Sequence, residues 1–143
     1  MITIERAIDP QTEERFSCVF DTKTCLPVEP IQRYLNYCRK RQLAANTVQT
    51  YAFRLLNFWQ WLEYKSLDWQ QIGSYELADF VNWYLLGGDV EVISEEVREV
   101  VSKRSARTVN QAITAIQEMY EFHVLEGRID DKQFAYQQYG WGK

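Results

Sequence analysis

The sequence predicts a mainly α-helical protein: a compact bundle of four helices, or five, preceded by a short extended or β-hairpin arm. Apolar residues recur at i, i+3, i+4 and i+7 in four segments, the spacing of one helix face. The 143 residues, 46% of them hydrophobic and 15% aromatic, suffice for one core but not for two ordinary domains. We therefore expect an arm over residues 1–28, a helical domain over 29–129 and a tail over 130–143.

The arm is predicted from two runs of β-branched and aromatic residues, 2–4 and 16–20, with turn-forming residues after each. Pro30 suits the first turn of a helix, which we expect to end near Gln42. The apolar positions of this first helix are Ile31, Tyr34, Leu35 and Cys38.

A second helix is predicted to start with Asn46 as its N-cap and Gln49 in the capping-box position. On a wheel of 100° per residue, its opposite arc is polar and holds no acid before Glu63. Phe53 and Trp61 are expected to be exposed aromatic residues outside the apolar arc. That arc consists of Val48, Tyr51, Ala52, Leu55, Leu56, Phe58, Trp59 and Leu62.

Two more helices are predicted after residue 73. The first has Ser74 as its N-cap, stops at Gly87-Gly88 and buries Leu77, Phe80, Val81, Tyr84 and Leu85. The connection over 87–104 could contain a short fifth helix from about Ser94. The last helix starts with Ser105 as its N-cap and ends at Gly127. Its apolar arc consists of Val109, Ala112, Ile113, Ile116, Met119, Tyr120, His123 and Val124.

Charge is unevenly distributed along the chain, although the net charge is only −4. Residues 32–54 carry +5 with no acid, residues 98–107 carry +3, and residues 55–97 carry −7. The two basic blocks lead into two similar stretches, 45–48 (Ala-Asn-Thr-Val) and 106–109 (Ala-Arg-Thr-Val). Three identical residues between the two stretches are too few to indicate a duplicated repeat. We therefore interpret the stretches as two helix starts of similar composition.

Several functional classes find no support in the residues. The three cysteines lack CxxC spacing, which favours free thiols over disulfides or a metal site, and we expect no metal and no cofactor. The one histidine, His123, lies on an apolar arc and is better explained as a packed, hydrogen-bonded core residue than as a catalyst. No segment resembles a membrane span or signal peptide, so we expect a cytoplasmic protein without membrane contact.

The helix starts are the candidate binding site. A helix N-terminus presents unpaired N–H groups and a partial positive charge that attract phosphate, and nearby polar side chains can hold a phosphate or touch a base edge. The competing explanation is that these polar residues only cap helices and that the basic residues only face solvent. The candidate residues are Asn46, Thr47, Gln49, Thr50, Arg54, Lys103, Arg104, Ser105, Arg107, Thr108, Asn110 and Gln111.

The chain resembles the N-terminal core-binding, SAM-like domain of tyrosine recombinases of the phage-integrase type. Four motifs over about residues 28–129 carry this resemblance, in the order expected for the family. They are Tyr34-Leu35; residues 46–55 (Asn-Thr-Val-Gln-Thr-Tyr-Ala-Phe-Arg-Leu) with Phe58 and Trp61-Leu62; residues 77–80 (Leu-Ala-Asp-Phe); and residues 105–110 (Ser-Ala-Arg-Thr-Val-Asn) with Ile113, Ile116, Tyr120 and Glu126-Gly127.

The resemblance implies a four-helix domain that clamps one side of a recombination site on double-stranded DNA. Its implied partners are a C-terminal catalytic domain of the same protein and other recombinase protomers, in a prokaryotic or mobile-element setting. The family's catalytic set includes a His-x-x-Arg motif and a tyrosine nucleophile, which a chain with one histidine in Phe122-His123-Val124 cannot supply. We therefore expect no enzyme activity from these residues alone, and interpret them as part of a longer recombinase.

Two alternatives remain open at this point. A helical protein-interaction module would use exposed aromatic residues such as Phe53 and Trp61, whereas a small independent enzyme has no supporting set of residues. For the DNA-binding interpretation, we expect Arg54→Ala and Arg107→Ala to weaken duplex binding with little change in thermal unfolding.

Overall fold

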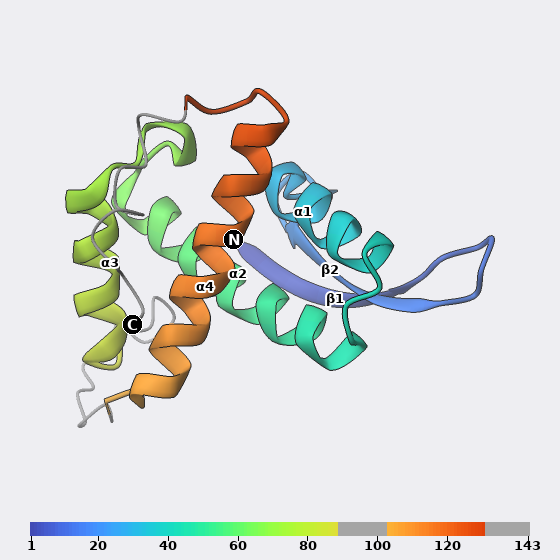
Figure 1. The fold of residues 1–143 in the computed structure, drawn as a ribbon, viewed down its shortest axis with the longest axis horizontal. Helices are drawn as coiled ribbons and strands as arrows, with labels where there is room; N and C mark the ends of the chain where they lie inside the picture. The colour runs from blue at the N-terminus through green and yellow to red at the C-terminus, as the bar shows by residue number, and fades with distance from the viewer. Residues whose placement is uncertain (89–102, 131–143) are drawn as a thin grey trace.

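The computed structural model describes residues 1–88 and 103–130 and confirms a mainly helical protein with an N-terminal antiparallel sheet (Figure 1). The possible helix from Ser94 and residues 131–143 of the predicted tail lie outside the described residues. The elements, in order, are β1 Ile2–Ile8, β2 Arg15–Asp21, β3 Leu26–Pro27, α1 Glu29–Lys40, α2 Ala45–Lys65, the short 3₁₀ helix η1 Trp69–Gln71, α3 Ser74–Leu85 and α4 Ala106–Leu125.

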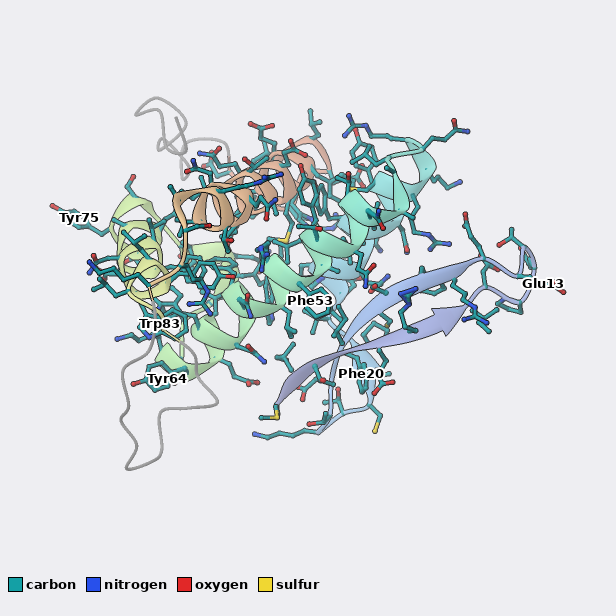
Figure 2. All side chains as sticks on the ribbon, turned by 90° about the horizontal axis from the view of Figure 1, so that it is seen from below. Glu13, Phe20, Phe53, Tyr64, Tyr75 and Trp83 are labelled. Atoms are coloured by element: carbon teal, nitrogen blue, oxygen red, sulfur yellow. The ribbon has the colours of Figure 1, made fainter. Side chains whose placement is uncertain are left out.

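The three strands form a sheet in the order β1-β2-β3 that packs against α2. β1 and β2 form a long hairpin, in register from Ile2 opposite Asp21 to Ile8 opposite Arg15. Its far end, near Glu13, extends away from the helices (Figure 2). At its near end Gln60 of α2 donates a hydrogen bond to the carbonyl of Ile2 at 3.1 Å, and Val19 is fully buried. The sheet therefore shares the hydrophobic core of the helices.

The helix starts differ from the prediction at two of three positions. α2 begins two residues earlier, with Ala44 at the N-cap, so Asn46 lies inside the first turn and its side chain makes no cap. The reason is the sharp turn before it: Gln42 has a φ of 64°, and the Leu43 N–H donates to the Cys38 carbonyl.

In α3 the N-cap is Gly73 rather than Ser74, because the Glu76 carboxylate accepts a hydrogen bond from the Gly73 N–H at 2.8 Å. The Ser105 N-cap is confirmed: its hydroxyl accepts from the Thr108 N–H at 3.1 Å. Gly127, with a φ of 78°, follows the end of α4 as expected.

The predicted apolar arcs form the core, with a few corrections at their edges. The four apolar positions of α1 are all buried, as are most of those of α2 and α4. Tyr51, Trp59, Val81 and Val124 are only partly buried, and Leu85 is exposed.

The prediction that Trp61 is exposed is wrong. Its side chain is 1% exposed, because α3 packs against this side of α2 and places Phe80 edge-on to the Trp61 ring, 5.5 Å between centroids. Phe53, by contrast, is 41% exposed on the outer surface of α2 (Figure 2). The protein-interaction alternative therefore keeps one of its two aromatic residues.

His123 is a buried, fully hydrogen-bonded core residue, as predicted. Its Nε2 lies 2.8 Å from the Pro30 carbonyl oxygen, and its Nδ1 lies 2.9 Å from Nη1 of Arg128. Since a carbonyl can only accept and a guanidinium can only donate, this arrangement requires the neutral ring with its proton on Nε2. Burial, more than the neighbouring Arg128, lowers the pKa of His123 below its ordinary value.

We expect the free energy of unfolding to fall as the pH is lowered below about 6.5, the ordinary pKa of histidine. Unfolded His123 takes up a proton there, whereas the folded protein resists protonation until a lower pH. His123 therefore lowers stability by up to about 1.4 kcal/mol per pH unit between the two pKa values. Urea unfolding at several pH values, compared with His123→Gln, isolates this contribution. An identical pH dependence in the variant would assign the effect to other groups.

Candidate nucleic-acid interface

The first turns of α2 and α4 both lie along the lower edge of the view in Figure 1, but apart from each other. The two helices cross where the second turn of α4 meets the third turn of α2. There Nη2 of Arg54 donates to Oε1 of Gln111 at 3.5 Å. The two helix starts are thus joined through this crossing, and we refer to the surface along it as the α2–α4 seam.

The seam contains an open depression of about 540 Å³ between the two helices. Arg107 and Asn110 are exposed beside it, and Gln111 is half-buried. Its lining residues are Tyr51, Arg107, Asn110, Gln111 and Thr114. The structure therefore brings three of the predicted α4 residues together with α2.

Arg54 is half-buried and connects three helices. Besides Gln111 of α4, its guanidinium donates to the hydroxyl of Tyr84 of α3 at 3.4 Å, and that hydroxyl donates to Asn57 of α2 at 2.5 Å. Its Nε is buried and has no hydrogen-bond partner among the described residues. The expectation that Arg54→Ala leaves thermal unfolding almost unchanged therefore needs revision, since the change removes contacts that hold the bundle together.

Arg104 is also used within the protein. Its Nη1 donates to the carbonyls of Tyr84 and Gly88 at 2.9 and 2.8 Å, and its guanidinium lies 3.9 Å from the centroid of the Tyr84 ring. Its backbone N–H donates to the Leu85 carbonyl at 3.0 Å. Arg104 thereby fixes the start of α4 to the end of α3, while the neighbouring Lys103 is exposed.

Asn46 and Gln49 face a different part of the surface. They line a second depression of about 400 Å³ between the start of α2 and the hairpin, together with Arg6, Arg15 and Arg39. Arg39 is neutralised there by Glu14 at 3.1 Å and by Asp9 at 3.9 Å. The predicted site is therefore divided between the seam and this hairpin side.

The remaining candidates are small polar residues at the helix starts. Thr47 and Thr50 are half-buried on α2, and Ser105 and Thr108 are engaged with each other in the cap of α4. The start of α2 has no side-chain cap and no acidic residue in its first turn. Its first N–H groups are thus open to an anion.

In the part of the chain that the structure describes, acidic side chains do not pair with the cations of the site. Within residues 1–88 and 103–130, no salt bridge engages Arg54, Lys103, Arg104 or Arg107. Burial, with Glu118 as the next contributor, raises the pKa of Tyr51, so its hydroxyl keeps its proton as a donor at neutral pH.

Sequence reasoning missed Tyr51 and Thr114 as seam residues. The wheel places Tyr51 in the apolar arc of α2, so the sequence predicts a core residue there, whereas the structure leaves Tyr51 partly exposed. Thr114 lies seven residues, or about two turns, after Arg107, and this spacing could have placed it on the same face.

Other kinds of site find no support in this part of the chain. No group of three His, Cys, Asp or Glu side chains in the described ranges could hold a metal ion. Cys18, Cys25 and Cys38 are all free. No helix among the described residues is long and apolar enough to cross a membrane.

Comparison with known proteins gives a family for this fold. The phage integrase N-terminal SAM-like domain matches residues 31–127, which include all four helices except the first two residues of α1. Curated relatives named transposase A from transposon Tn554, of Staphylococcus aureus, are 22% identical over 95 residues. The aligned region covers 66% of this chain but only 26% of the relative, and no solved structure matches the chain. The chain belongs to the phage integrase N-terminal SAM-like domain family.

Proposed function

We propose that this chain is the DNA-binding domain of a site-specific tyrosine recombinase that clamps one side of the core site. Domains of this family typically bind DNA, and the seam is the observation that carries the assignment to these residues. There Arg54, Arg107 and Gln111 converge on one side of the bundle without a neutralising salt bridge among the described residues. Cationic and amide donors of this kind hold phosphate oxygens and fix the register of a protein on duplex DNA.

The two arginines of this group have different tasks in the proposal. Arg107 is exposed and reaches a phosphate directly, together with Lys103 and Asn110. Arg54 contributes its charge from a half-buried position, and Arg104 keeps the start of α4 in place. Asn46 and Gln49 extend the contact along the DNA toward the hairpin side, beside the open N–H groups of α2.

Catalysis is assigned to a separate C-terminal domain of the same protein, and strand exchange to an assembly with further protomers on DNA. The transposase relatives, of which the aligned region covers about a quarter, support such a longer protein. The net charge of −4 makes a modest affinity of the isolated domain the expected result.

A salt series tests the DNA-binding proposal. We expect fluorescence anisotropy of a labelled duplex to give a log Kd that changes linearly with log salt concentration. Three phosphate contacts, through Arg54, Lys103 and Arg107, correspond to a slope in log affinity of roughly −2.7, at about −0.9 each.

A duplex affinity that does not change with salt concentration would overturn the proposal and favour a protein-interaction module. The exposed Phe53 then becomes the first residue to test, with Phe53→Ala in a pull-down of the intact chain.

A further inference from the structure

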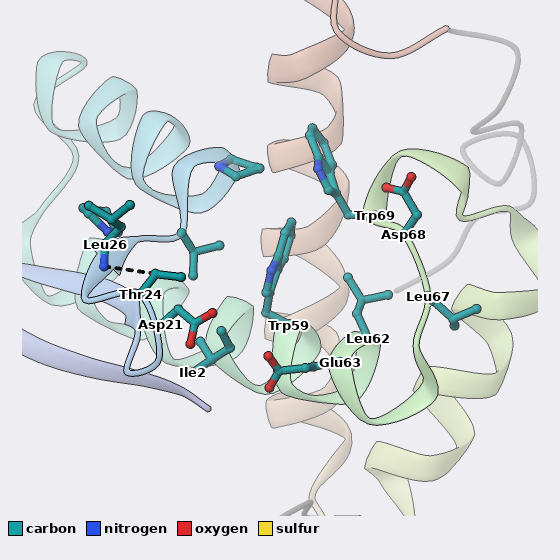
Figure 3. Close-up of a pocket in the computed structure, with 13 residues that line it drawn as sticks. Ile2, Asp21, Thr24, Leu26, Trp59, Leu62, Glu63, Leu67, Asp68 and Trp69 are labelled. Carbon is teal, nitrogen blue, oxygen red and sulfur yellow. Dashed lines mark hydrogen bonds between the residues drawn. The ribbon is translucent and has the colours of Figure 1, made fainter.

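A second surface feature lies at the other end of α2, where the sheet, the end of α2 and the loop before α3 meet (Figure 3). It is a pocket of about 480 Å³. Two indole rings, of Trp59 and Trp69, stand in its middle with centroids 5.8 Å apart and planes tilted by 41°. Ile2, Leu62 and Leu67 are among the aliphatic residues of its wall.

The polar rim of this pocket is acidic. Asp21, Glu63 and Asp68 line it, and among residues 1–88 and 103–130 no lysine or arginine does so. Asp21 and Glu63 lie on the same side of Trp59, and Asp68 lies beside Trp69 (Figure 3). In the part of the chain that the structure describes, no salt bridge engages Glu63 or Asp68.

Asp21 and Asp68 have additional contacts, and the unpaired negative charge of the rim lies on Glu63 and Asp68. One oxygen of Asp68 caps η1 by accepting from the Gln70 N–H at 3.0 Å. Asp21 lies 3.5 Å from the α-ammonium of Met1. A hydrogen bond from the Lys23 N–H lowers the pKa of the Asp21 carboxyl, which is therefore ionised at neutral pH.

We propose that this pocket binds an arginine side chain presented by a peptide segment of a partner protein. A guanidinium stacks on indole rings and pairs with carboxylates through its planar set of donors. The aliphatic wall accommodates apolar residues on either side of that arginine, while the carboxylates of Glu63 and Asp68 repel the phosphates of a nucleic acid. The charge of the rim therefore selects a basic protein segment as the occupant.

The pocket is separate from the α2–α4 seam. The two depressions share no lining residue, and on α2 Tyr51 of the seam lies eight residues, or about 12 Å along the helix axis, before Trp59 of the pocket. A partner in the pocket leaves the seam open, and this inference does not depend on the proposed function.

Two peptides that differ only in charge test the inference on the full chain. The first is acetyl-Gly-Leu-Arg-Leu-Gly-amide, and the second carries citrulline, the uncharged isostere, in place of arginine. We expect the arginine peptide to shift the indole N–H resonances of Trp59 and Trp69 in ¹H–¹⁵N NMR spectra, with an affinity about tenfold higher than that of the citrulline peptide. Equal affinities, or the absence of shifts at these two tryptophans, would overturn the inference.

Carboxylate variants identify the rim as the source of the selectivity. We expect Glu63→Gln combined with Asp68→Asn to weaken the arginine peptide about tenfold, with the NMR spectrum of the fold retained because asparagine also caps a helix start. The matched control is Glu13→Gln combined with Glu121→Gln, which removes the same charge from exposed positions outside the pocket. An equal loss of affinity in the control would mean that net charge alone determines peptide binding, and would refute a specific pocket.

Discussion

We expect Phe58→Ala to lower the free energy of unfolding by about 3–5 kcal/mol, the range for removing a buried aromatic side chain. Phe58 is fully buried, and its ring contacts residues from three helices. Ring centroids of Phe80 in α3 and Tyr120 in α4 lie 5.2 and 6.2 Å away, both edge-on. Because a domain of this size has only about 5–15 kcal/mol of stability in total, one such cavity removes a large part of it.

Phe53→Ala on the same helix is the matched control for that experiment. Phe53 is 41% exposed, so the same truncation there is expected to lower stability by only about 1 kcal/mol. Urea unfolding followed by far-UV circular dichroism measures both variants. Similar losses at the two positions would contradict the core described here, as would a Phe58→Ala variant as stable as the parent.

The helical spacing of apolar residues predicted most of this core, because amphipathic helices must bury one face. The helical wheel wrongly predicts that Trp61 is exposed, because α2 lies in the middle of the bundle. A wheel divides a helix into one buried and one exposed arc, whereas α2 is covered by the sheet, α1, α3 and α4. Which sides of a central helix are covered depends on tertiary packing, which local spacing does not encode.

The sequence shows which cations lie at the two helix starts, but it does not show how the fold uses each of them. Arg39, Arg54 and Arg104 all belong to the basic blocks, yet each is engaged by residues distant in sequence. Arg39 pairs with Glu14, 25 residues away, and Arg104 binds the Tyr84 carbonyl, 20 residues away. These pairings depend on the hairpin and on the α3–α4 packing, so a sequence alone cannot separate structural arginines from those open to a ligand.

Lys103→Ala combined with Arg107→Ala is therefore expected to weaken duplex binding more than any change at the arginines used within the fold. Both side chains are exposed at the start of α4 and take part in no salt bridge within the described ranges. Loss of two phosphate contacts is expected to reduce the salt slope by roughly 1.8 and the affinity at low salt by about tenfold or more. The thermal unfolding midpoint is expected to stay almost unchanged, because neither side chain is buried.

Lys23→Ala combined with Lys65→Ala gives the control, since it removes the same charge from exposed positions on the β2–β3 turn and at the end of α2. If duplex binding depends on the start of α4, the control variant retains the salt slope of the parent. An equal loss of duplex affinity in both double variants would mean that net charge alone governs binding. Arg54→Ala completes the comparison, because it removes a cation that also holds α2 to α3 and α4. We expect it to lower both duplex affinity and the unfolding midpoint, and this combined loss distinguishes a cation that supports the bundle from one that only faces the DNA.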